Sequence, residues 1–105
     1  MQELPTRDQF AEQMGSTFTV RFGPETQVEM KLIEVTEPKH SGQREAFSLL
    51  FQAPPGTPVW QNLFPVEHPK LGAMDLFLVP VGGDERGIDF EAVFNRIVQP
   101  RPDQS

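Results

Sequence analysis

The sequence contains no cysteine, no tyrosine and a single tryptophan. Without cysteine the chain cannot form a disulfide, a thiolate metal site or a cysteine nucleophile. Its longest uninterrupted apolar runs span only a few residues, and no charged and then apolar segment opens the chain. We therefore expect neither a membrane span nor secretion through a signal peptide. These absences favour a cytoplasmic protein that does not act at a membrane.

Positive charge is also scarce, with 9 Lys and Arg against 15 Asp and Glu and a net charge of −6. Binding to nucleic acid needs clustered basic side chains that neutralise phosphates, so we expect no nucleic-acid partner. The two histidines do not have the spacing of a metal-binding motif, and the acidic residues near position 85 do not match a calcium loop. The sequence therefore predicts no metal site and no cofactor.

What the chain does contain is proline, glycine and phenylalanine. Eleven Pro and eight Gly in 105 residues favour short elements joined by turns over long helices. Nine Phe indicate a core of few, large side chains. A chain of this length builds one modest core, so residues 1–105 are expected to form a single domain.

A short helix is predicted over residues 6–14. Thr6 is followed three residues later by glutamine, which is the pattern of a capping box. Phe10 and Met14 are four residues apart and would share one face, and Gly15 would end the helix in a left-handed conformation. Two turns of helix are not stable alone. We therefore expect the helix to dock through Phe10 and Met14 as a plug at one end of a sheet.

The first two strands follow from alternation of polar and apolar residues over residues 17–22 and 27–35. In the second strand the alternation changes phase at Leu32 and Ile33. One extra residue there would restore the inward direction of the apolar side chains, which is the effect of a β-bulge in a bending sheet.

The rest of the chain is read as a polar loop over residues 36–45 and four further strands. These strands are predicted at residues 47–51, 59–66, 74–81 and 90–97. The last segment also matches helical spacing, but its neighbours favour a strand. Pro80 has no N–H to donate, so it is expected near the end or on the outer edge of its strand, where pairing stops.

Residues 76–83, with the sequence LFLVPVGG, are apolar at consecutive positions. A strand that is solvated on one face alternates, so we expect this strand to be covered on both faces. Together these patterns predict a mostly β fold, a small antiparallel β-barrel or strongly bent sheet of about six strands with a short N-terminal helix. The barrel is expected over residues 17–98, and a flexible tail over residues 99–105.

No pattern of nucleophile, base and acid emerges, so we expect no catalytic residue and no enzyme activity. An enzyme would need at least a pair of histidine and acid, for which His68 is the best candidate, although its ring more simply bonds the following turn. Trp60 lies beside a proline-rich loop, and tryptophan is enriched at binding hot spots. We place a candidate interface at Trp60, with Phe64 and His68 as further members.

Four blocks in order are FSLLF at residues 47–51, HPKLG at residues 68–72, LFLVPVG at residues 76–82 and EAVFN at residues 91–95. With these blocks the chain resembles a family of small bacterial proteins, domain of unknown function 6916. The resemblance covers residues 15–97 and implies no activity or catalytic residue. It implies occurrence beside phage-tail-like genes, and hence an accessory role in such an assembly. It also favours a strand for the last element.

The leading hypothesis is therefore a non-enzymatic module for protein interaction or assembly, with another protein as its partner. The alternative is a carrier that holds a small apolar ligand inside the barrel. Nine Phe make a carrier conceivable, but a barrel of this size is normally filled by its own side chains. The oligomeric state is left open.

Overall fold

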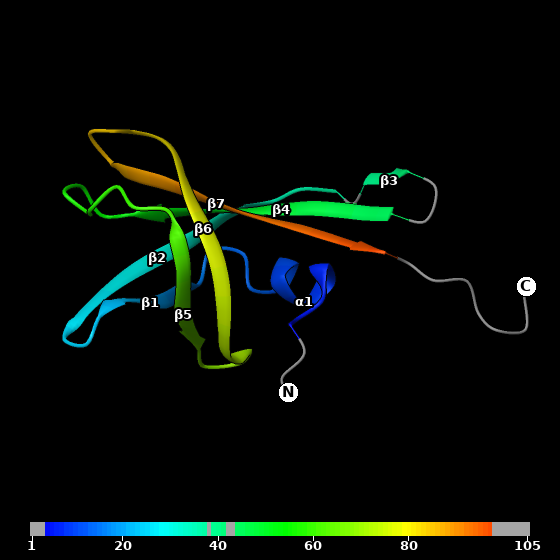
Figure 1. Cartoon of the computed structure of the whole chain (residues 1–105), viewed down its shortest axis with the longest axis horizontal. Coiled ribbons are helices and arrows are strands. Elements are labelled where there is room, and N and C mark those ends of the chain that lie inside the picture. Colours follow the sequence, from blue (N-terminus) through cyan, green and yellow to red (C-terminus); the bar gives the residue numbers. More distant parts are fainter. Residues whose placement is uncertain (1–3, 38, 42–43, 98–105) are drawn as a thin grey trace, which may run out of the picture.

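The computed structural model describes residues 4–37, 39–41 and 44–97, which form one helix and seven strands (Figure 1). The predicted tail, residues 99–105, lies outside the described residues. The elements in chain order are α1 (Arg7–Ala11), β1 (Thr17–Gly23), β2 (Thr26–Val35), β3 (Lys39–Ser41), β4 (Arg44–Ala53), β5 (Asn62–His68), β6 (Gly72–Asp84) and β7 (Gly87–Ile97).

Six of the strands close into an antiparallel barrel. The sheet order is β2-β1-β5-β6-β7-β4-β3, and an additional pairing of β2 with β4 joins its two sides. The short strand β3 pairs with the first residues of β4, beyond the part of β4 that β2 occupies. The predicted mostly β fold, with an antiparallel barrel and a short helix, is confirmed.

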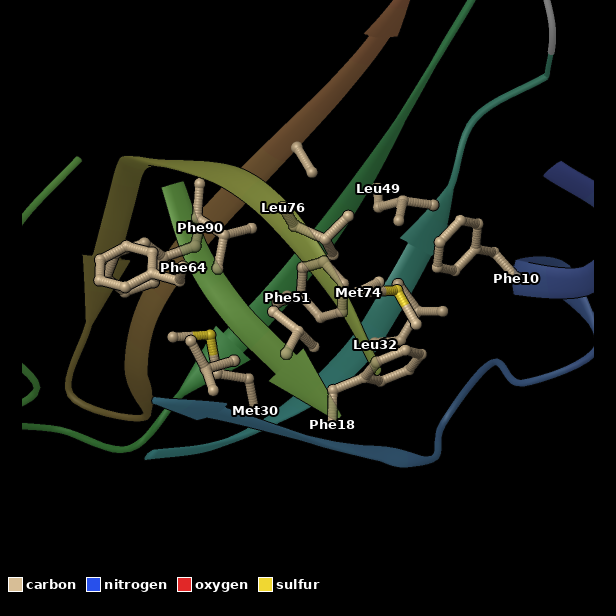
Figure 2. Close-up of a cluster of buried hydrophobic side chains, with 14 of the residues drawn as sticks. Phe10, Phe18, Met30, Leu32, Leu49, Phe51, Phe64, Met74, Leu76 and Phe90 are labelled. Atoms are coloured by element: carbon tan, nitrogen blue, oxygen red, sulfur yellow. The ribbon is translucent and has the colours of Figure 1, made fainter. Parts of the chain in front are cut away.

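The barrel interior is filled by its own side chains. Side chains from β1, β2, β4, β5, β6 and β7 converge on one cluster, as Figure 2 shows. The largest fully buried ones are Phe10, Phe18, Phe51, Phe90, Met30, Leu32, Leu49, Leu78, Val20 and Val66. Four phenylalanines among them confirm the prediction of a core built from few, large side chains.

The β-bulge predicted in β2 is present. Leu32 pairs with Phe51 and Glu34 with Leu50, so Ile33 is the extra residue between two successive pairs. Leu32 remains fully buried, while Glu34 faces solvent. The bulge lets β2 bend from β1 toward β4 and so helps to close the barrel.

Helix α1 covers one end of the barrel, but it is shorter than predicted. The capping box is formed: the hydroxyl oxygen of Thr6 accepts a hydrogen bond from the Gln9 N–H, and the Thr6 N–H donates to Gln9 Oε1. Phe10 is fully buried and contacts the ring of Phe94, with 5.6 Å between centroids. Because the helix ends at Ala11, Met14 lies in the following turn and is 49% exposed. The docking role predicted for Met14 was wrong.

Several strand boundaries differ from the prediction because local polarity is a poor guide to pairing. β3 lies inside the predicted polar loop, where backbone pairing with β4 outweighs the polar sequence. β5 begins at Asn62, three residues later than expected, since proline-rich chain precedes it. The strand predicted over residues 90–97 is confirmed as part of β7.

Pro80 does not mark the end of its strand. It pairs with Phe90, a register shift follows between Pro80 and Gly82, and pairing continues to the Asp84–Gly87 pair. A bulge accommodates a residue without an N–H, which lets β6 run past the proline. The expectation that pairing stops at Pro80 was wrong.

The outer face of β6 also differs from the prediction. Leu76 and Leu78 are buried, whereas Phe77 and Val81 are each 52% exposed. The apolar run at residues 76–83 was expected to be covered on both faces, and this was wrong because none of the described segments covers the barrel's outer face at Phe77. The exposed Phe77 on this face belongs to the candidate site.

Candidate functional site

Two large apolar side chains lie together on the outer face of the barrel. Leu63 of β5 and Phe77 of β6 are directly paired across the strands, and they are 56% and 52% exposed. Directly paired residues share one face of a sheet, with Cβ atoms about 5 Å apart. The solvent side of this strand pair therefore carries a continuous apolar surface, which we call the Leu63–Phe77 pair.

A stack of aromatic rings lies nearby, at the end of the barrel opposite α1. Phe22 stacks on Phe64, with 4.5 Å between centroids, and on Trp60, with 5.7 Å between centroids. Phe90 meets Phe22 edge-on at 6.1 Å. The stack runs from buried Phe64 and Phe90 to Trp60, which is 52% exposed. Trp60 therefore exposes an aromatic surface to solvent while its ring packs on Phe22.

This end of the barrel is only partly closed by backbone pairing. β1 and β5 are joined by two residue pairs, of which Val20–Val66 is the last. Toward this end of the barrel, Val66 is preceded in β5 by Pro65, which has no N–H to donate to β1. Further along, the Leu63 N–H is satisfied by the neighbouring Asn62 Oδ1 at 2.8 Å. A proline and a capped N–H disfavour the addition of another strand to this edge, so side chains are the groups it offers to a partner.

Of the three predicted interface residues, only Trp60 is on the surface. Phe64 is 2% exposed and His68 is 6% exposed, because both point into the barrel from β5. Buried side chains offer almost no area to a partner, so the candidate interface does not include them. Its members are Trp60 and the Leu63–Phe77 pair.

The Leu63–Phe77 pair was missed by sequence reasoning. Leu63 and Phe77 are apolar at positions where alternation predicts a solvent-facing polar residue, and this was the available signal. At Phe77 it was instead interpreted as burial of both faces of the strand, and at Leu63 it was not used.

His68 is a structural residue that connects three segments. Its Nδ1 accepts hydrogen bonds from the backbone N–H groups of Lys70 and Leu71 at 3.0 and 3.3 Å, as predicted for the turn. Its ring lies 4.4 Å from that of Phe18 between centroids. On the other side, Nε2 is 2.9 Å from Ser16 Oγ.

The pair of Ser16 and His68 has the wrong polarity for nucleophile activation. Because Nδ1 accepts two N–H donors, the ring proton must reside on Nε2, which then donates to Ser16 Oγ. The Ser16 hydroxyl in turn donates to the Gln13 carbonyl at 2.6 Å. A general base would need a free lone pair directed at the hydroxyl. The pair instead ties the turn after α1 to the β5–β6 turn.

This arrangement predicts a stability that depends on pH. Burial, together with the nearby Lys70 ammonium, lowers the pKa of His68 below its ordinary value of 6.5. The unfolded chain therefore binds more protons in this range, so the contribution of neutral His68 is complete above about pH 6.5 and is lost as the pH falls toward the lowered pKa.

His68→Gln tests this linkage by urea unfolding between pH 5 and pH 7. We expect the variant to be less stable by about 1–3 kcal/mol at pH 7, and the gap to wild type to narrow as the pH falls. The other titrating groups are common to both proteins and cancel in the difference. A gap that stays constant with pH would contradict the assignment of the proton.

A shallow groove of about 450 Å³ lies at the same end of the barrel as Trp60. Val59 forms one side, and the β6–β7 hairpin forms the other through Pro80, Gly82, Gly83, Asp84 and Ile88. Figure 1 shows this hairpin and the β4–β5 connection at the end of the barrel away from α1. Within the part of the chain that the structure describes, no three histidine, aspartate or glutamate side chains come together to hold a metal ion. Nor does any described helix have the length and apolar character to cross a membrane.

The chain was compared with protein families, curated proteins and solved structures. A family model described as "Domain of unknown function (DUF6916)" matches residues 5–94. No curated protein and no solved structure matches the chain.

Proposed function

Since the chain belongs to the family described as a domain of unknown function (DUF6916), which carries no assigned activity, we propose from its surface that it is a non-enzymatic module that binds another protein. The observation that carries this proposal is the Leu63–Phe77 pair. Two large apolar side chains, each more than half exposed, sit directly opposite each other on a well-formed strand pair. An exposed apolar patch of this kind is typical of an interaction surface.

Nearby Trp60 supports the same proposal. Aromatic residues that are fixed by packing lose little conformational freedom on binding, and tryptophan is among the commonest hot-spot residues. Here Trp60 is held by its stack on Phe22 while half of it stays exposed. The surface therefore combines an anchored aromatic ring with an apolar strand pair.

The alternative function, a carrier of an apolar ligand, has less support. Phe18, Phe51 and Phe90 are all buried within the barrel, so the phenylalanines that suggested a ligand fill its interior themselves. An accessory role in a phage-tail-like assembly and a cytoplasmic location stay predictions from the sequence and its resemblance.

The proposal is tested by comparing proteins captured from lysate of the source organism by wild type and by the double variant Leu63→Thr/Phe77→Thr. Threonine keeps the preference for strand while it removes the apolar surface. We expect a defined protein on the wild type that is lost on the double variant, as identified by mass spectrometry. Met14→Thr is the matched control, because Met14 is 49% exposed but lies outside β5 and β6. Identical capture by wild type and double variant would contradict the proposal.

A further inference from the structure

The groove beside Val59 has a composition that selects one kind of side chain. Val59, Pro80 and Ile88 give it apolar walls, and Asp84 is the one charged residue among those that line it. A long basic side chain fits this combination, because its methylene stem packs on apolar walls while its charged head meets a carboxylate. An apolar side chain would gain nothing from the carboxylate, and an acidic one would be repelled by it.

The two glycines of β6 that line this groove have different roles. A Cβ added at Gly82 would meet no atom within 4 Å. Glycine is therefore not needed there to avoid a clash, and its missing side chain leaves open space. Gly83 is different, because a Cβ there would lie 2.9 Å from the Gly87 carbonyl oxygen. Gly83 is thus required by the hairpin, whereas Gly82 is free to accept a larger residue that would fill the groove.

Asp84 is held in place and still accessible. Its Oδ1 accepts a hydrogen bond from the Arg86 N–H at 2.8 Å. Its Oδ2 lies 4.0 Å from Arg86 Nε, and both side chains are mostly exposed. An ion pair this long and exposed contributes little to stability, so a basic side chain of a partner can replace Arg86 beside Asp84 with little loss of free energy.

The charges of the hairpin that borders the groove favour a basic partner over a second copy of this chain. The β6–β7 hairpin and the start of β7 carry four acids against one base, Arg86; the acids are Asp84, Glu85, Asp89 and Glu91. Beside the Leu63–Phe77 pair, Asp75 adds a further acid opposite Pro65. A symmetric contact would place these acidic rims against each other. A partner with apolar residues flanked by basic ones would be complementary to them.

We propose that the groove between Val59 and the β6–β7 hairpin binds a lysine or arginine side chain of the partner protein. This inference rests on the proposed function and specifies the chemistry of the partner. The partner's apolar residues contact Trp60 and the Leu63–Phe77 pair, and its basic residue enters the groove.

The groove is tested by NMR titration of the ¹⁵N-labelled chain with three tripeptides. The probes are acetyl-Leu-Arg-Leu-amide and its analogues with citrulline or glutamate in place of arginine. We expect the arginine peptide to shift the amide signals of Val59, Gly82, Gly83, Asp84 and Ile88. Citrulline has nearly the same shape without the charge, so it should bind about two- to fivefold more weakly, and glutamate more weakly still. Equal shifts with all three peptides, or none, would overturn the proposal.

Two variants make the test specific to the groove. Asp84→Asn retains the acceptor for the Arg86 N–H but removes the charge, so it should equalise the arginine and citrulline peptides. Gly82→Leu should abolish binding by filling the groove. If the same signals move when the protein is concentrated without peptide, a second copy occupies the groove and the proposal fails.

The two proposals can fail separately in the capture experiment. Loss of the partner with Leu63→Thr/Phe77→Thr but full retention with Asp84→Asn would keep the proposed function and reject the basic side chain. Specific binding of the arginine peptide, with the partner retained on the double variant, would keep the groove and reject the Leu63–Phe77 pair as the contact surface.

Discussion

Replacing Phe18 with alanine is expected to destabilise the protein by about 3–5 kcal/mol, which is a large share of the total stability of a small domain. Phe18 is fully buried in the barrel interior. Its ring contacts Phe51 edge-on at 5.2 Å and lies 4.4 Å from the ring of His68, between centroids. The substitution removes these contacts and leaves a cavity that the closed barrel cannot collapse to fill.

Urea unfolding followed by circular dichroism measures this loss, with Phe77→Ala as the matched control. Phe77 is the same residue type on the outer face, 52% exposed, and its removal should cost less than about 1 kcal/mol. If Phe18→Ala does not fold, Phe18→Leu keeps part of the volume and should lie between the two. Equal losses for Phe18 and Phe77 would contradict the assignment of the inner and outer faces.

Replacing Gly87 with alanine is the second change with a large expected effect. A Cβ at Gly87 would lie 2.1 Å from the Ala53 carbonyl oxygen, which is far inside contact distance. Because this oxygen belongs to the backbone, it cannot move aside as the end of a flexible side chain could. The adjacent Ala53–Ile88 pair is the last pair of β4 with β7, so the clash must push these two strands apart. Steric overlap of this kind costs about 1–3 kcal/mol or more.

The matched control for this change is Gly82→Ala in the same hairpin, where a new Cβ meets nothing within 4 Å. The thermal unfolding midpoint should fall clearly for Gly87→Ala and stay nearly unchanged for Gly82→Ala. The opposite order, or two equal shifts, would mean that the pairing of β4, β6 and β7 differs from the one described.

Features set by local chemistry were predicted well from the sequence. The capping box at Thr6 and the bulge after Leu32 were predicted from residues that are close in the chain. Gly15 is left-handed as predicted, with φ of +83°, but it lies in the turn after the helix and does not end it. Alternation also identified β1 and β2, whereas the last strand, which also matched helical spacing, was assigned from its neighbours and the family resemblance. For the capping box, the bulge, β1 and β2 the neighbouring residues alone determine the energetics, so no knowledge of the tertiary fold was needed.

Features set by distant parts of the chain were not predictable in the same way. β3 is formed by pairing with β4, although its sequence is polar. Pro80 continues a strand because a bulge follows it. Whether Phe77 is buried depends on whether another layer covers the outer face, and the alternation of a single strand carries no information about that.

The candidate site illustrates the same limit. Trp60 was predicted as an interface residue from its residue type and its proline-rich surroundings, and it is 52% exposed. Phe64 and His68 were predicted as further members of the interface, but the strand directs both into the barrel. The pairing of Leu63 with Phe77 joins two strands and becomes visible only when their register is known.

The central claim is that the apolar surface on β5 and β6 binds a partner protein. The most direct test is the dissociation constant of the captured partner, measured by titration calorimetry against wild type and Leu63→Thr/Phe77→Thr. Removing two exposed apolar side chains from the proposed contact surface should weaken binding at least about tenfold, which corresponds to about 1.4 kcal/mol, with Met14→Thr unchanged. Dissociation constants that agree within about twofold for wild type and the double variant would contradict the claim.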